Sequence, residues 1–331
     1  MDRLVRPIPW SKGGTDPRPL IEREWLVTNG LGGYACGTLA GASTRRYHGL
    51  LVAAHAAPLG RVMMFNHLAE QFRFPGWETV AVGGSERPGG TLEVHGADAL
   101  TEFRLEEGLP VWKYETHGHV FEKRVFMPHR RNTVHVVYRL LEGPGPVRLK
   151  LRPGVHFRGH DDPVSSRSPE PYMLTAVDGR YELSAPGPFP PLRLKLTGDG
   201  GGFTLDGLKT PEILYRVEED RGYEGVGVLW SPGAFRVNLR PDKPVVLTAS
   251  TETWERALAL PAEEALEAEL ERRRKLVAMA APAARTGFGA ELVLAADQFV
   301  ISPATRAADA ARAAAAGEDA RTVVAGYHWF T

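Results

Sequence analysis

Short segments in which apolar and polar residues alternate run through residues 1–258 of this chain, with turn residues between them. The chain has 331 residues, of which 36 are glycine and 26 are proline, and these fall between the segments rather than inside long helical patterns. Alternation places the apolar side chains of a strand on one face and its charges on the other, as in residues 147–152 and 192–196. Short alternating segments separated by turn residues predict a large antiparallel β-sandwich.

Further strands are expected at residues 124–126, 133–140, 213–217, 225–230, 235–239 and 245–251. After Pro261 the pattern becomes helical: residues 263–279 contain no glycine or proline, begin with acids and continue into bases, which suits a helix macrodipole. A second helix, ending near Pro303, is indicated by apolar residues on one helical face at Leu292, Ala295, Ala296, Phe299 and Val300. The alanine-rich residues 304–320 suit either a helix or a mobile excursion.

The charge balance and the cysteine count exclude several classes of protein. Lys plus Arg and Asp plus Glu both number 40, so nucleic acid is not an expected partner. The single cysteine, Cys36, excludes an internal disulfide and a multi-cysteine metal site. No stretch approaches the roughly 20 apolar residues of a membrane span, and residues 1–10 lack the apolar run of a signal peptide. We therefore expect a cytoplasmic protein with no metal and no cofactor.

A glycine-rich stretch at residues 30–35 fits the dinucleotide fingerprint G-x-G-x-x-A, but its context does not suit that function. The fingerprint needs a following helix and an acidic residue about 20 positions later. Here Gly37, Gly41 and Ser43 argue against a helix, and residues 49–51 are Gly-Leu-Leu. We interpret the glycines as a tight loop whose backbone packs closely or approaches a ligand.

Two segments carry a resemblance to a known family. Residues 24–35 (Glu-Trp-Leu-Val-Thr-Asn-Gly-Leu-Gly-Gly-Tyr-Ala) are followed closely by residues 43–51 (Ser-Thr-Arg-Arg-Tyr-His-Gly-Leu-Leu). Residues 324–331 read Val-Ala-Gly-Tyr-His-Trp-Phe-Thr. Together they resemble the bacterial and archaeal glycogen debranching enzymes, the amylo-α-1,6-glucosidase family, whose catalytic domain is entered through a segment like the second. The family pattern has a proline where this chain has His328.

The resemblance implies a mainly β fold: a large antiparallel β-supersandwich, then a linker helix and the first helix of an incomplete (α/α)6 barrel of the glucoamylase kind. The corresponding domains are residues 1–258, a linker at 259–285, and the start of a truncated catalytic domain at 286–331. It also implies hydrolysis of α-1,6 branch linkages in glycogen or related α-glucans, with limit dextrin and maltooligosaccharide as further ligands. The remainder of the catalytic domain would be a partner of this chain.

The candidate substrate-binding residues combine guanidinium, imidazole and aromatic groups, which suit sugar hydroxyls and the C–H faces of sugar rings. They are Arg45, Arg46, Tyr47, His48, Tyr327, Trp329 and Asn29. Each has a structural alternative. Arg46 and His48 could tie their loop to a neighbouring domain, Arg45 could be a solvated charge, Tyr327 and Trp329 could be barrel packing, and Asn29 could be a turn residue.

No convincing catalytic carboxyl pair is visible in the sequence. The acidic clusters at 106–107, 161–162, 218–220 and 263–264 suit turns and helix starts, where acids are common. We therefore expect no catalytic residue in this chain. The catalytic carboxyl groups would lie in a segment beyond it. The alternatives are a terminal strand that docks onto its own domain, a standalone carbohydrate-binding or scaffold protein, and another glycoside hydrolase or phosphorylase with the same architecture.

Overall fold

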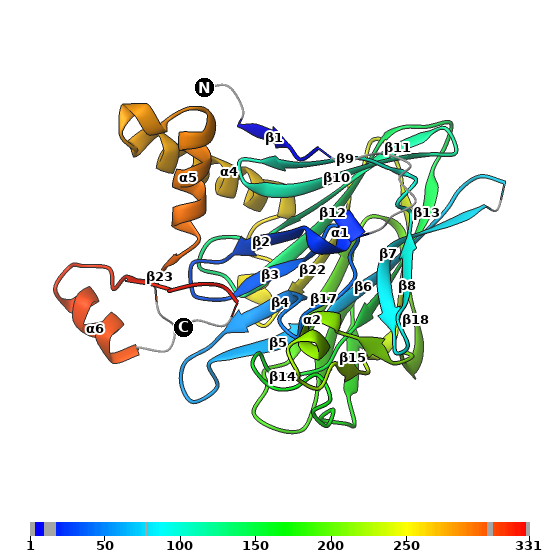
Figure 1. The fold of residues 1–331 in the computed structure, drawn as a ribbon, viewed down its shortest axis with the longest axis horizontal. Coiled ribbons are helices and arrows are strands. Elements are labelled where there is room, and N and C mark those ends of the chain that lie inside the picture. Colours follow the sequence, from blue (N-terminus) through cyan, green and yellow to red (C-terminus); the bar gives the residue numbers. More distant parts are fainter. Residues whose placement is uncertain (1–3, 10–17, 77, 303–306, 329–331) are drawn as a thin grey trace.

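The computed structural model describes residues 4–9, 18–76, 78–302 and 307–328 and is mainly antiparallel β-sheet, with helices towards the carboxyl-terminal end (Figure 1). This confirms the expected fold class of a β-sandwich followed by helices. No helix in the described ranges is long and apolar enough to cross a membrane.

One layer is a nine-stranded sheet. Its order is β1 (Val5–Pro7), β9 (Leu100–Glu106), β10 (Leu109–Thr116), β11 (His119–Phe126), β12 (Thr133–Glu142), β22 (Val245–Ser250), β17 (Leu192–Thr197), β16 (Arg180–Ser184) and β15 (Met173–Val177). Its central strands β12 and β22 are buried along most of their length. Such strands are rich in β-branched residues because both of their faces are covered.

The opposing layer consists of two sheets. The six-stranded sheet has the order β18 (Asp199–Lys209), β21 (Trp230–Leu239), β13 (Val147–Gly154), β6 (His67–Arg73), β7 (Thr79–Arg87) and β8 (Thr91–His95). The five-stranded sheet has the order β14 (Arg158–Gly159), β5 (Arg61–Phe65), β4 (Gly49–Ala54), β3 (Tyr34–Thr38) and β2 (Glu24–Thr28). Because β5 runs into β6 through a single residue, Asn66, the two sheets form one nearly continuous surface.

The two layers share one hydrophobic core. Trp25 of β2 meets Trp112 of β10 edge-to-face, with ring centroids 5.4 Å apart. Phe72 of β6 stacks on Phe121 of β11 at 4.2 Å. These large aromatic contacts bury much apolar surface per residue and fix the spacing of the layers.

The remaining elements are short strands and helices. The helices are α1 (Arg18–Glu22), α2 (Arg216–Asp220), α3 (Trp254–Ala257), α4 (Ala262–Met279), the 3-10 turn η1 (Pro282–Ala284), α5 (Gly287–Asp297) and α6 (Ala307–Ala315). Two strand pairs complete the description: β19 (Ile213–Leu214) with β20 (Val226–Gly227), and β23 (Val300–Ile301) with β24 (Thr322–Val323). Helix α4 packs onto the sandwich core through Ala265, Leu266 and Leu270.

Three sequence expectations need correction. The second helix was expected to continue to Val300, but α5 ends at Asp297, because Val300 and Ile301 pair with the strand at Thr322–Val323. The strand expected at 213–217 stops at Leu214, where the chain turns into α2. Within the strand expected at 225–230, only Val226–Gly227 forms β20, and Trp230 already begins β21. Within 304–320, residues 307–315 form a helix.

The glycine-rich loop at 29–33 packs closely, as the sequence predicts. Gly30 has a φ of 70°, and a Cβ there would lie 2.3 Å from the ring of His129. A Cβ at Gly33 would lie 2.7 Å from the carbonyl oxygen of Val52. The residues after this loop form strand β3 rather than a helix, so the dinucleotide fingerprint has no structural counterpart.

Candidate functional site

The loop between β3 and β4 folds back on itself through its own polar groups. The Thr44 N–H donates to Nδ1 of His48 at 3.1 Å, and the His48 N–H donates to the carbonyl oxygen of Arg45 at 3.1 Å. Because Nδ1 accepts a hydrogen bond, the neutral His48 ring carries its proton on Nε2. That nitrogen lies 3.3 Å from Oε1 of Glu24, so His48 joins the loop to β2.

Glu24 is the negative centre of this loop. Its Oε1 also accepts a hydrogen bond from Nε of Arg45 at 2.6 Å. Burial works towards a higher pKa for Glu24, but the hydrogen bonds from His48 and Arg45 and the positive charge of Arg45 outweigh it and lower the pKa to about 2. The carboxylate is therefore ionised at neutral pH and holds both partners.

Arg46 connects the loop to helix α2. Its backbone N–H donates to Oε1 of Glu218 at 3.0 Å, and its Nε donates to Oε2 of the same carboxylate at 2.9 Å. The Glu218 side chain is only 1% exposed. The guanidinium also lies over two aromatic rings, 4.5 Å from the centroid of Tyr223 and 5.4 Å from that of Tyr47. A charge pair with such burial and two-point geometry fixes the orientation of Arg46.

A second loop, at 158–162, packs beside the first. The buried guanidinium of Arg158 donates to the carbonyl oxygens of Gly159, His160 and Asp162 at 3.1–3.2 Å, and to that of Arg46. The Arg46 guanidinium donates in turn to the carbonyl oxygen of Asp161 at 2.9 Å. Two arginine side chains therefore hold the two loops together through backbone carbonyl oxygens.

The segment before the carboxyl terminus docks onto the same place. The His328 ring is parallel to that of Tyr47, with centroids 5.8 Å apart. Tyr327 meets Tyr34 of β3 edge-to-face at 5.4 Å, and Nη1 of Arg61 donates to the carbonyl oxygen of His328 at 2.9 Å. Burial lowers the pKa of His328 to about 3, so the ring is neutral at physiological pH. The two segments that carry the family resemblance thus meet in space.

The structure therefore brings together most of the residues that the sequence singled out. Arg45, Arg46, Tyr47, His48 and Tyr327 lie in this one cluster, contributed by the β3–β4 loop and the carboxyl-terminal segment. Of these, Arg45 is not merely solvated, because it is hydrogen-bonded to Glu24. Trp329 lies outside the described residues.

Asn29 uses its whole side chain within the protein. Its Oδ1 accepts from the N–H groups of Leu31 and Gly33 at 2.9 and 3.0 Å, and its Nδ2 donates to the carbonyl oxygen of Arg131 and to Oδ1 of Asn132, both at 3.0 Å. The residue is fully buried. These contacts are those of a turn residue that also anchors the loop to the strand connection at 131–132.

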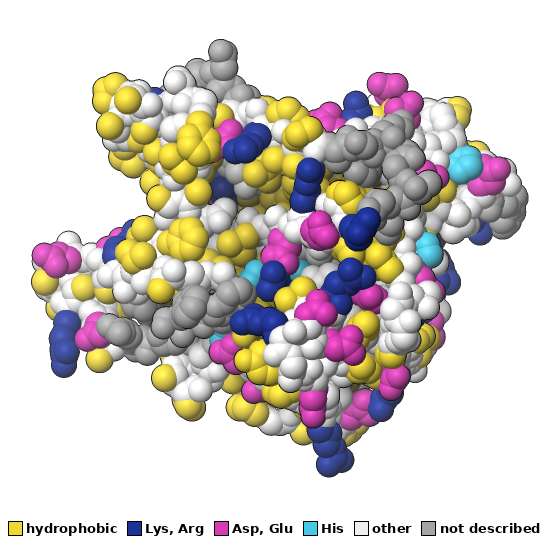
Figure 2. All heavy atoms as spheres, in the orientation of Figure 1, with side chains coloured by type: hydrophobic (Ala, Val, Ile, Leu, Met, Phe, Trp, Pro, Cys, Tyr) yellow, Lys and Arg dark blue, Asp and Glu magenta, His cyan; other side chains and the backbone are white. Residues whose placement is uncertain are grey.

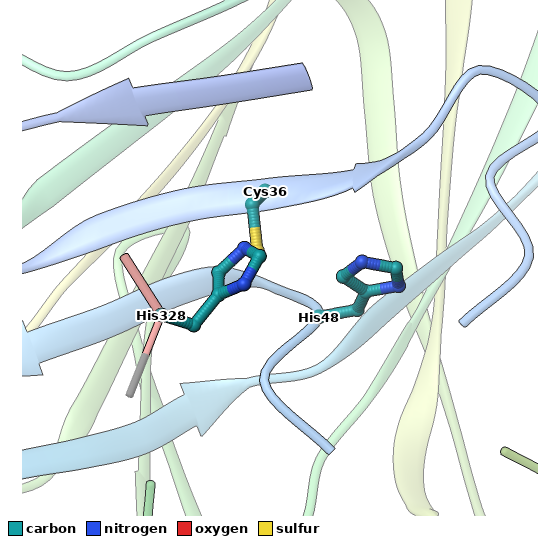
Figure 3. Close-up of side chains that lie close together, drawn as sticks. All are labelled: Cys36, His48 and His328. Carbon is teal, nitrogen blue, oxygen red and sulfur yellow. The ribbon is translucent and has the colours of Figure 1, made fainter. Parts of the chain in front are cut away.

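A Cys–His–His group lies at the centre of the cluster (Figure 3). Cys36, His48 and His328 offer ligand atoms within 4.8 Å of one another, and all three side chains are buried. Their hydrogen bonds disfavour a metal. Nδ1 of His48 accepts from the Thr44 N–H, its Nε2 lies 3.3 Å from the Glu24 carboxylate, and the Cys36 thiol donates to the carbonyl oxygen of Tyr47 at 3.3 Å. Burial also raises the pKa of that thiol, so it stays protonated.

Sequence reasoning missed the residues that hold the cluster together. Glu218 belongs to the acidic run at 218–220 and lies in the first turn of α2, as a helix-start acid would, but the sequence did not show that it is the buried partner of Arg46. Arg158 and His160 are both buried, but nothing local in the sequence shows it. Both partnerships join residues more than 110 positions apart, so only the fold reveals them.

The fold defines an antiparallel β-sandwich protein with a helical extension, whose β3–β4 loop, 158–162 loop and carboxyl-terminal segment converge. A family profile described as glycogen debranching enzyme N terminal matches residues 23–246. The chain belongs to this family, and it therefore contains the amino-terminal domain of a glycoside-hydrolase type of protein.

Similarity to individual known proteins is low. A search of curated proteins finds no match. Among solved structures, a bacterial glucoamylase complexed with acarbose is similar at 7% sequence identity and a TM-score of 0.36, over 84% of this chain and 41% of the glucoamylase chain. The chain thus spans less than half the length of that protein.

Proposed function

We propose that this chain is the glucan-handling amino-terminal portion of a debranching enzyme that hydrolyses α-1,6 branch linkages in glycogen or related α-glucans. The observation that carries the proposal is the meeting of the two family-like segments: the Tyr47–His48 loop packs against Tyr327 and His328, and the rings of Tyr47 and His328 lie 5.8 Å apart. A sugar-handling surface needs such a mixture of fixed donors and aromatic faces. The family match over residues 23–246 supports the same assignment.

Hydrolysis of a glycosidic bond with inversion needs two carboxyl groups about 6.5–9.5 Å apart, one protonated and one ionised. Several acidic candidates of this chain have structural partners instead. Glu106 pairs with Arg104 and Arg124, and Glu218 pairs with Arg46. We therefore assign the catalytic acid and base to polypeptide beyond residue 331, with residues 1–258 as the glucan-binding and structural domain, 259–285 as the linker and 286–331 as the entry to the catalytic domain. The reaction needs no cofactor, and a cytoplasmic location suits a store of glycogen.

The experiment is a comparison of glucose release from glycogen limit dextrin by two proteins. The 331-residue chain is expected to release none, because neither member of the carboxyl pair belongs to it. The product of the coding sequence continued past residue 331 is expected to release glucose. Glucose release by the 331-residue chain itself would contradict the assignment of the catalytic acid and base to polypeptide beyond residue 331.

The rival proposal is a carbohydrate-binding or scaffold protein that holds glucan without cutting it. The observation that favours it is the burial of His328 against Tyr47, because the described residues alone then cover both of these rings. A continued product that binds maltooligosaccharide but never releases glucose would support this rival.

A further inference from the structure

The surface beside the loop cluster carries an exposed aromatic ring. Tyr223, just after α2, is 53% exposed, and the backbone around it is fixed because its N–H donates to the carbonyl oxygen of Glu218 at 2.9 Å. The Arg46 guanidinium, itself held by Glu218, lies 4.5 Å from the ring centroid. An aromatic ring that is held in place and yet half open to solvent costs little entropy when a ligand stacks on it.

The residue whose backbone carbonyl oxygen accepts from the same guanidinium, Asp161, carries an exposed carboxylate. The side chain of Asp161 is 61% exposed and lies 3.4 Å from Nε2 of His160. Its backbone cannot easily move, because its carbonyl oxygen accepts from Arg46 and its neighbours are held by Arg158. The Asp161 carboxylate also accepts a hydrogen bond from the Tyr47 hydroxyl; burial above all, and then the charge of Asp161, raise the pKa of Tyr47 to about 12. His160 and the Tyr47 hydroxyl thus orient the carboxylate, while most of it faces solvent.

These two groups have the chemistry of a sugar subsite. The C–H face of a glucosyl ring packs on an aromatic ring, and a carboxylate accepts hydrogen bonds from two neighbouring hydroxyls. Charged side chains of both signs gather over α2 and the loop ends beside it (Figure 2). We propose that Tyr223 and Asp161, with Arg46 beside both, form a subsite for one glucosyl unit of an α-glucan chain on the outer surface of the sandwich. This inference rests on the proposed glucan-handling function and adds to it a place of contact that lies outside the buried cluster.

The test is the affinity of the 331-residue chain for maltoheptaose, measured by isothermal titration calorimetry. Tyr223→Ala and Asp161→Asn are each expected to weaken binding about five- to tenfold, and Tyr223→Phe to keep it within about twofold, because stacking needs the ring and not the hydroxyl. The matched controls remove an exposed aromatic ring and an exposed carboxylate elsewhere. They are Phe288→Ala on α5 and Asp242→Asn between β21 and β22, and neither should change the affinity.

The outcomes separate this inference from the proposed function. Wild-type binding with unchanged affinity in both Tyr223→Ala and Asp161→Asn overturns the subsite and leaves the glucan assignment standing. A folded wild-type chain that does not bind maltoheptaose contradicts the glucan assignment and the subsite together. Thermal unfolding of each variant should match the wild type, since both side chains are largely exposed; a loss of affinity that follows a loss of folding would count against the subsite.

Discussion

Replacing Glu269 with alanine is expected to lower the free energy of unfolding by about 3 to 5 kcal/mol. Glu269 lies on α4 and is 2% exposed, as is its partner Arg273, whose Nε donates to it at 2.7 Å. The same carboxylate also holds Arg272, which reaches Asp297 on α5 at 2.9 Å. Without the carboxylate, the charge of Arg273 stays buried beside a single carbonyl oxygen, that of Glu107. Urea denaturation followed by circular dichroism measures the change.

Glu271→Ala on the same helix is the control. Glu271 pairs with Lys275 at 2.7 Å with the same spacing of four residues, but both side chains are exposed. Its loss should leave the free energy of unfolding nearly unchanged, because an exposed ion pair is screened by solvent. Equal effects in the two variants would show that burial does not decide the strength of these pairs, and that α4 is not held to the sandwich through Glu269.

Asn29→Ala is expected to destabilise the protein by about 3 kcal/mol, since each hydrogen bond contributes roughly 1 kcal/mol and buried groups left unpaired cost more. The variant loses four hydrogen bonds of 2.9–3.0 Å and leaves the N–H groups of Leu31 and Gly33 without their acceptor. Thermal and urea unfolding would both report the loss. Asn238→Ala, which removes one half-buried contact with Arg148 at 2.9 Å, should cost about 1 kcal/mol. A tolerated Asn29→Ala would show that these four hydrogen bonds do not hold the loop in place.

Local patterns predicted the architecture where they were regular. The alternation at 147–152 and 192–196 became β13 and β17 because a two-residue period fixes which face is buried. The acid-to-base run at 263–279 became α4. The pattern failed at Val300, where helical spacing continued but a partner strand was available more than 20 residues later. Pairing between distant segments overrides a local period, and no single-sequence pattern reports it.

The site was predictable only in part for the same reason. The sequence marked Arg45, Arg46, Tyr47 and His48 because they stand together between glycines, and Tyr327 because it stands in an aromatic run. It did not show that the two groups touch, nor that Glu218 and Arg158 hold them. Those contacts depend on loops that the sheets bring together, so predicting them requires the order of the strands and not the local sequence alone.

Arg46 illustrates how a candidate binding residue can also be structural. Its backbone and Nε are committed to Glu218 and one terminal nitrogen to Asp161, while its planar face supports the ring of Tyr223. We infer that Arg46 acts on glucan chiefly by positioning Tyr223 and Asp161. The proposed contact with sugar then falls on residues with exposed side chains, and the buried Tyr47–His48 pair fixes the shape beneath them.

Hydrogen–deuterium exchange of the 331-residue chain, with and without saturating maltoheptaose, tests the central claim most directly. Glucan contact at the converging loops predicts slower exchange in peptides that cover residues 43–49, 158–162 and 216–224, with unchanged exchange in α4 and α5. Protection confined to α4 and α5, or no protection anywhere at a ligand concentration that saturates binding, would contradict it.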